Sequence, residues 1–230
     1  MTILSVTELH FINKPPKFRI NNKPIKSTMI KKIAFVVAFA FISQLTIAQN
    51  LSFGPIVGAN FSELYNLSNS STKTGAKFGA FINYSTEKSF GVGLQVYYNQ
   101  LGANTGNSTD KLKLNYIEVP LLATYYLGHG ISQGSFRPKV FIGPHVDFLL
   151  NAADSRGNDV NPNGSTINSV DYGVTVGAGL NYALAKKTWL NFDIRYAAGL
   201  SDVYKSPALS TVRNNNISIN VGVSFPIGNL

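Results

Sequence analysis

A histidine and an aspartate are the residues whose types and spacing come closest to a catalytic arrangement. His145 and Asp147 stand two positions apart, so in a β-strand their side chains share a face. A carboxylate beside an imidazole can orient it as a general base, but such a triad also needs a nucleophile. No serine partner is evident, and His129 lies between glycines in a predicted turn. We interpret His145 as structural and expect no enzyme activity, with a lipid-modifying enzyme as an alternative.

Two glycine clusters and one polar loop match known ligand sites only in part. Gly91-Val92-Gly93 and Gly177-Ala178-Gly179 lack a following helix whose N-terminus would hold a phosphate. They are better explained as strand glycines that ease curvature or avoid crowding. Residues 154–161 contain oxygen ligands for calcium but depart from the EF-hand order and lack its closing Glu. The chain has no cysteine, which excludes disulfides and thiolate metal sites. We expect no cofactor and no metal.

The positive charge of the chain is concentrated near its beginning. The net charge is +9, yet residues 1–49 contain seven Lys or Arg and a single acid, Glu8. The rest of the chain shows no basic face laced with aromatics, so no nucleic-acid partner is expected. Charged residues make up only 13% of the chain, against about 25% in typical soluble proteins. Together with the many Gly, Tyr and Phe residues, this composition favours many short strands over a helical enzyme.

A secretory signal peptide is predicted at residues 29–49. Met29-Ile30-Lys31-Lys32 is a basic start, residues 33–42 are apolar, and Thr46-Ile47-Ala48 has small residues at the cleavage-site positions. The apolar run is far shorter than the roughly 20 residues of a transmembrane helix. We therefore expect export through the Sec pathway. Residues 1–28 fit no part of this plan and are interpreted as a mis-assigned start, or else as an unstructured leader, before a barrel domain at 50–230.

Period-two alternation recurs along the whole chain after residue 50. In Asn216-Ile217-Ser218-Ile219-Asn220-Val221 every odd position is apolar and every even position is polar. Pro120 and Pro144 interrupt two of the segments, whose registers stay open. The same pattern predicts eight strands, at 52–62, 75–86, 89–101, 113–127, 137–150, 169–183, 188–200 and 214–227.

Strand length and loop order favour a membrane barrel over a soluble sandwich. Most of the segments run longer than the 5–6 residues that are typical of soluble strands, and reach the roughly 9–11 of tilted membrane strands. Short links alternate with long connections rich in Asn, Ser, Gly and Thr, as in outer-membrane barrels with short periplasmic turns and long outer loops. We therefore predict an all-β fold: a transmembrane, antiparallel, up-and-down barrel of eight strands.

Aromatic residues on the apolar face of these strands should gather at two heights. Tyr, Trp and Phe favour the two membrane interfaces, and a soluble sandwich has no reason to place them there. Tyr116 and Trp189 fall in the opposite phase of their strands. The periplasmic girdle is predicted to contain Phe53, Tyr84, Phe90, Tyr125, Tyr182 and Phe225, and the outer girdle Phe61, Tyr98, Phe148, Tyr172 and Tyr196.

The stretch Tyr116-Ile117-Glu118-Val119-Pro120-Leu121 and the opening Gly54-Pro55-Ile56-Val57-Gly58 resemble the PorT-like outer-membrane β-barrel family. The resemblance covers about residues 50–230. It implies an outer-membrane barrel in a family whose members mostly lack an assigned activity. The family supplies no catalytic residues to transfer.

The polar face of the strands is predicted to fill the barrel interior. An eight-stranded barrel is just wide enough for side chains, and charges inside it must be compensated. We expect Arg195 and Lys77 to pair with acids there, in a structural network of Lys77, Glu118, His145, Asp147, Asp193 and Arg195. The sequence thus predicts a monomeric outer-membrane barrel that contacts lipid, acts structurally or binds envelope proteins through its loops, with a pore for small solutes or ions as an alternative.

Overall fold

The computed structural model describes most of the chain after residue 50. The described ranges are 51–67, 69–86, 89–106, 111–128, 133–185, 188–206 and 211–227. All of them belong to the second of two compact units, Ile47–Leu230. The predicted leader at 1–28, the signal peptide at 29–49 and His129 lie outside these ranges. Within them, no helix is long and apolar enough to cross a bilayer.

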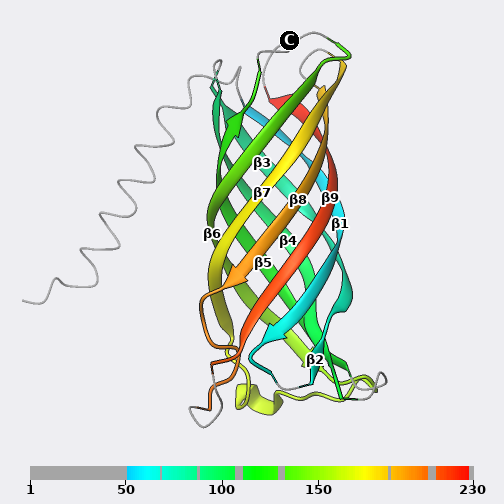
Figure 1. Cartoon of the computed structure of the whole chain (residues 1–230), viewed down its shortest axis with the longest axis vertical. Helices are drawn as coiled ribbons and strands as arrows, with labels where there is room; N and C mark the ends of the chain where they lie inside the picture. Colours follow the sequence, from blue (N-terminus) through cyan, green and yellow to red (C-terminus); the bar gives the residue numbers. More distant parts are fainter. Residues whose placement is uncertain are drawn as a thin grey trace, which may run out of the picture. The chain divides into compact units, whose positions relative to one another are not determined.

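Within the described ranges, eight long strands follow one another, with one very short strand between the first two. They are β1 (Leu51–Tyr65), β2 (Ser70–Ser71), β3 (Lys73–Ser85), β4 (Phe90–Thr105), β5 (Lys111–Tyr126), β6 (Phe136–Ala153), β7 (Val170–Ala185), β8 (Thr188–Gly199) and β9 (Arg213–Ile227). Each long strand pairs antiparallel with the next, and β1 pairs with β9, which closes the sheet into a barrel (Figure 1). The predicted eight-stranded, up-and-down barrel is confirmed.

Several strands extend beyond the predicted segments at one end of the barrel. This long-loop end holds the connections β1–β3, β4–β5, β6–β7 and β8–β9, which gather at the lower end of Figure 1. The opposite, short-turn end holds the other connections. At the long-loop end, β4 continues to Thr105 and pairs with β2, which the sequence did not predict. Beyond the bilayer these strands still have neighbours to which their backbones hydrogen-bond, so strand pairing continues after the apolar alternation has ended.

The strands carry apolar side chains on the outside of the barrel and polar side chains on the inside, the reverse of a soluble protein. Val57 and Ile194 are 58% and 61% exposed on the outside, whereas Asn60 and Arg195 are 0% and 2% exposed inside. Apolar residues face outward on every long strand, in a belt far larger than the apolar patches of soluble monomers. Such a belt is stable only against lipid.

Aromatic pairs mark both edges of this belt. Phe90 and Tyr125 have ring centroids 5.1 Å apart near the short-turn end, and Phe78 and Tyr98 are 5.0 Å apart near the long-loop end. The two residues that fell out of phase face the interior instead. Tyr116 is fully buried, and Trp189 is half-buried at the short-turn end of β8.

The strands that contain Pro120 and Pro144, β5 and β6, keep a regular register at these two prolines. Pro120 pairs with His145 across β5 and β6, and Pro144 pairs with Val174 across β6 and β7. The irregularity in this region lies elsewhere, at a register shift between Asn115 and Tyr116. Because of this shift, the inward-facing positions of β6 change from odd to even residue numbers near the long-loop end.

The closed barrel should resist detergent until it is heated. Every long strand has two hydrogen-bonded neighbours and the barrel has no open edge, so denaturation requires opening the whole sheet. We expect the protein from outer-membrane fractions to migrate differently on a denaturing gel before and after boiling. A single unshifted band in the soluble periplasmic fraction would contradict the membrane barrel.

Candidate functional site: the barrel lumen and its mouth

A buried ion pair inside the lumen joins β3 and β5. Lys77 Nζ is 2.7 and 2.9 Å from the two carboxylate oxygens of Glu118. Asn99 donates a further hydrogen bond to Glu118 Oε2 at 2.5 Å, and Asn60 donates to Asn99 at 2.5 Å. These side chains are buried. Charge-assisted bonds of this kind compensate the carboxylate in a space without bulk water.

A second charged cluster lies beside the first and joins β4, β6 and β8. Arg195 donates to Asp193 Oδ2 at 2.7 Å and to Gln95 Oε1 at 2.6 Å. Lys139 Nζ lies 2.8 Å from Asp193 Oδ1, so this aspartate pairs with two cations. Lys139 was not named in the sequence prediction, although it lies on the same inward face of β6 as Phe141 and His145.

An aromatic ring separates the two clusters. Lys77 Nζ lies 4.3 Å from the centroid of the Tyr97 ring, and the Arg195 guanidinium lies 5.5 Å from it. The Tyr97 hydroxyl donates to Gln95 at 2.6 Å. A cation above an aromatic face is attracted by the ring quadrupole. The clusters therefore form one continuous layer of side chains across the lumen.

Glycines on β7 provide the room for this layer. In register, Gly179 lies between Lys139 on β6 and Asp193 on β8, so the ion pair between these two residues passes over it. Gly177 lies in the same way between Phe141 and Arg195. A Cβ at Gly177 would lie 2.5 Å from the Phe141 ring. The cluster Gly177-Ala178-Gly179 thus avoids crowding inside the barrel.

His145 has both neighbours that a catalytic histidine needs. Its Nδ1 lies 2.9 Å from Thr175 Oγ1, and its Nε2 lies 3.7 Å from Asp147 Oδ2. The sequence did not reveal Thr175, which comes from the adjacent strand. His145 and Thr175 are only 4% and 1% exposed, and they do not line the cavities at the mouth of the barrel. Both side chains therefore lie inside the barrel, away from these two cavities.

The lumen is also narrowed toward the short-turn end. The Arg137 guanidinium lies 4.1 Å from the centroid of the Tyr126 ring, and the Tyr126 hydroxyl is 3.2 Å from Ser85 Oγ. Ile56 and Phe81 form a small apolar cluster with Tyr97 of the charged layer.

An apolar cap closes the lumen at the long-loop end. Two long connections pair with each other there: Asn168 N donates to Val203 O at 2.9 Å, and Val203 N donates to Val212 O at 2.8 Å. The hydroxyl of Tyr116, which belongs to this cap, donates to Asp171 Oδ2 at 2.7 Å. The cap consists of buried residues from strands and connections: Leu64, Leu101, Ala103, Leu114, Tyr116, Ala152, Ile167, Val203 and Val212.

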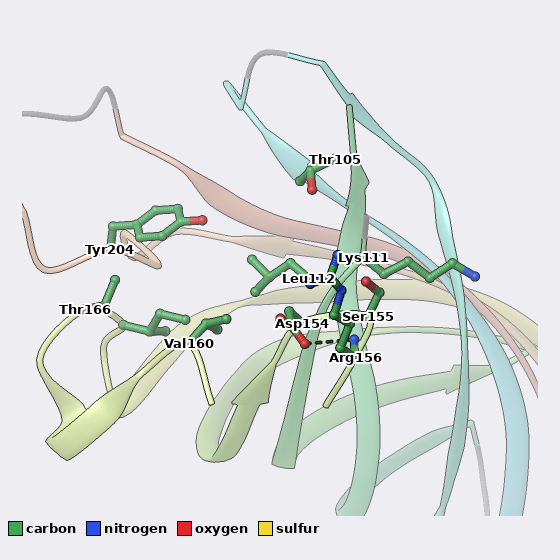
Figure 2. A pocket seen from close by; sticks show the side chains of 10 residues that line it. Thr105, Lys111, Leu112, Asp154, Ser155, Arg156, Val160, Thr166 and Tyr204 are labelled. Carbon is green, nitrogen blue, oxygen red and sulfur yellow. Dashed lines mark hydrogen bonds between the residues drawn. The ribbon is translucent and has the colours of Figure 1, made fainter. Parts of the chain in front are cut away.

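A cavity of about 410 Å³ lies above the cap. Figure 2 shows Val160, Thr166 and Tyr204 on one side of it and Lys111, Asp154, Ser155 and Arg156 on the other. Asp154 Oδ2 accepts a bond from the Asn158 amide at 2.8 Å, and Oδ1 accepts from the backbone of Asn158 and Arg156. These bonds from Asn158 and the loop backbone lower the pKa of the Asp154 carboxyl. Both oxygens are therefore engaged within the loop.

The structure places all six predicted network residues in the lumen, but it does not join them into one cluster. Lys77 pairs with Glu118, and Arg195 with Asp193, as the sequence analysis expected. Asp147 pairs in register with Glu118, but among the described residues neither Asp147 nor His145 forms a hydrogen bond with either pair, and Asp147 Oδ1 has no hydrogen-bond partner there. No group of three or more His, Cys, Asp or Glu in the described ranges is arranged to hold a metal ion.

The family is evident from a comparison with family models. The model for the outer membrane protein beta-barrel domain matches residues 16–205. This chain belongs to that family. The closed antiparallel fold, the apolar outer belt and the family match all indicate an outer-membrane barrel. The match is to the broad family, so the more specific resemblance to PorT-like barrels stays a prediction.

Solved outer-membrane barrels share the architecture at low sequence identity. Neisserial surface protein A is 18% identical, with a TM-score of 0.49, covering 75% of this chain and 97% of that chain. OprG from Pseudomonas aeruginosa is 14% identical, with a TM-score of 0.49, covering 76% and 95%. The outer membrane enzyme PagL is 13% identical, with a TM-score of 0.41, covering 75% and 99%. No curated protein matches the barrel. These identities are too low to transfer the function of any of the three.

Proposed function

We propose that this outer-membrane barrel is a closed, non-enzymatic protein that serves a structural or partner-binding role in the cell envelope. In this proposal the barrel is a monomer, exported through the Sec pathway after removal of a signal peptide at residues 29–49. Its belt contacts lipid, and its folded outer connections are the surface available to other envelope proteins. Outer loops commonly carry the binding functions of such scaffolds.

The observation that carries the proposal is the sequence of barriers along the lumen. The apolar cap, the charged layer around Glu118 and Arg195, and the narrowing at Tyr126 follow one another from one end to the other. A conducting pore would instead need a continuous water-filled path lined by polar groups. An ion crossing this lumen would have to displace buried ion pairs and then enter an apolar cluster, and both steps are costly.

Planar-bilayer recordings test this proposal against a pore. We expect the refolded wild-type barrel to give no steady single-channel steps, because the apolar cap and the buried ion pairs obstruct the lumen. Insertion is checked in the same preparation by the heat-dependent gel shift, so a silent bilayer cannot be blamed on unfolded protein. Steady steps in the pA range from inserted barrels would refute the closed lumen.

An enzyme is separated from a scaffold by the chemistry of the membrane lipids. Under the proposal, lipid A from a strain that lacks the gene is the same as in the parent strain. The buried position of His145 and Thr175 inside the barrel supports this expectation. A change in lipid A that a His145→Ala variant fails to reverse would establish the enzyme instead.

A further inference from the structure

The outward-facing residues of β3, β4 and β5 change character abruptly at the edge of the belt. Tyr98 pairs in register with Ile117, and its ring contacts Phe78, so these three residues mark the outer girdle. One outward position further along, Gln100 pairs with Asn115. The next outward residues of β5 are Lys113 and Lys111. An apolar wall thus becomes a basic one at the level where lipid headgroups begin.

A cavity of about 470 Å³ lies at this basic wall. It is lined by Lys73, Lys111 and Lys113, together with the amides of Gln100, Asn104 and Asn115. Lys73 comes from the strand on the far side of β4, and its amine donates to Leu101 O at 3.0 Å. Gly102, opposite Lys113, has a positive φ of 121°, and the pairing of the β2–β3 segment with β4 shifts register here. This bulge opens the wall between β3 and β4.

The three lysines bring together positive charge that no described carboxylate neutralises. Lys73 is only 8% exposed and lies within electrostatic reach of Lys111 and Lys113. In the described ranges, none of the three forms an ion pair with an acid. Holding three cations near one another is unfavourable unless an anion lies between them. Lysine is a good ligand for phosphate, which provides several oxygen acceptors and more than one negative charge.

We propose that this rim pocket binds the phosphate of a membrane lipid headgroup. The lipid, rather than free phosphate, is indicated by the continuity with the girdle: acyl chains along Phe78, Tyr98 and Ile117 end directly below the lysines. The amides around the pocket provide further hydrogen-bond donors and acceptors for the headgroup. The site lies on the outside of the barrel wall, so it does not depend on whether the lumen conducts.

Native mass spectrometry of the detergent-solubilised full barrel tests the site with three probes. Phosphatidic acid carries both phosphate and acyl chains, diacylglycerol carries only the chains, and inorganic phosphate carries only the anion. We expect one phosphatidic acid to stay bound to the wild type, with no retained diacylglycerol and much weaker binding of inorganic phosphate. In the Lys111→Gln/Lys113→Gln variant, phosphatidic acid should bind roughly 30-fold more weakly, because each lysine near an anionic headgroup contributes a separate attraction.

The control is Lys205→Gln, which removes a lysine at the same end of the barrel but outside the pocket. It should bind phosphatidic acid like the wild type. Lys111 and Lys113 face outward, so the double variant should keep the heat-dependent gel shift of a folded barrel. Equal retention of phosphatidic acid by wild type and double variant would overturn the proposal. Inorganic phosphate binding as tightly as phosphatidic acid would overturn its assignment to a lipid.

Discussion

Replacing Glu118 with glutamine should lower the free energy of unfolding of the barrel by about 3–5 kcal/mol, because the buried amine of Lys77 then loses the carboxylate that it contacts. Both carboxylate oxygens of Glu118 lie within 2.9 Å of Lys77 Nζ, and the lysine is 2% exposed. Glutamine has nearly the shape of glutamate, so the loss reports charge rather than packing. Urea titration of the barrel refolded into vesicles measures it.

The matched control for Glu118→Gln is the double variant Lys77→Met/Glu118→Gln. It removes both charges and leaves an amide oxygen as acceptor for Asn99. A neutral replacement of a buried pair is often nearly as stable as the pair itself, so the double variant should recover most of the loss. If the single variant unfolds at the wild-type urea concentration, the pair is not isolated from water, and the closed lumen loses its main support.

Replacing Gly179 with valine should be at least as damaging. A Cβ at this position would collide with Asp193 Oδ1 and the carbonyl oxygen of Phe192, and would lie 2.8 Å from Lys139 Cε. The substitution therefore both overpacks the lumen and displaces the Lys139–Asp193 ion pair, for a loss of roughly 3–5 kcal/mol. We expect little or no heat-shifted band on the gel and a much lower urea midpoint for any folded fraction.

The adjacent residue provides the control for Gly179→Val. Ala178 lies on the same strand but faces lipid, where an added apolar side chain is tolerated. Ala178→Val should thus fold like the wild type, with the same gel shift. Equal behaviour of the two valine variants would mean that β7 has no fixed inward face at this point, in contradiction to the register.

The strands and their inward faces could be predicted from the sequence because period two is a local signal. Every residue of the predicted lumen network is buried, and the aromatic girdles lie on the outer face. The partners of these residues are not local. Arg195 contacts Gln95, one hundred positions away, and no spacing in the chain indicates that contact. Lys139 was missed because its strand contains Pro144 and alternates less clearly than the others.

The cap at the mouth of the barrel could not be predicted for a different reason. Its residues in the connections, such as Ile167, Val203 and Val212, are single apolar side chains in polar stretches with no period of their own. They become a core only when two connections pair with each other. The contact of Thr175 with His145 could not be predicted from the sequence either, because it depends on the register between β6 and β7.

The spacing of the two girdles has a consequence for the membrane in which the barrel is stable. Phe90 and Tyr98 bound the belt on β4, and the eight residue steps from one to the other span about 26 Å along the strand. With the usual barrel tilt of about 40°, the hydrocarbon thickness that this belt matches is about 20 Å. This is thinner than an average bilayer of about 30 Å. Hydrophobic mismatch therefore favours a thin membrane, such as the bacterial outer membrane, over a thicker one. In a thicker bilayer the acyl chains would meet Gln100 and Asn115 unless the lipids around the barrel were compressed.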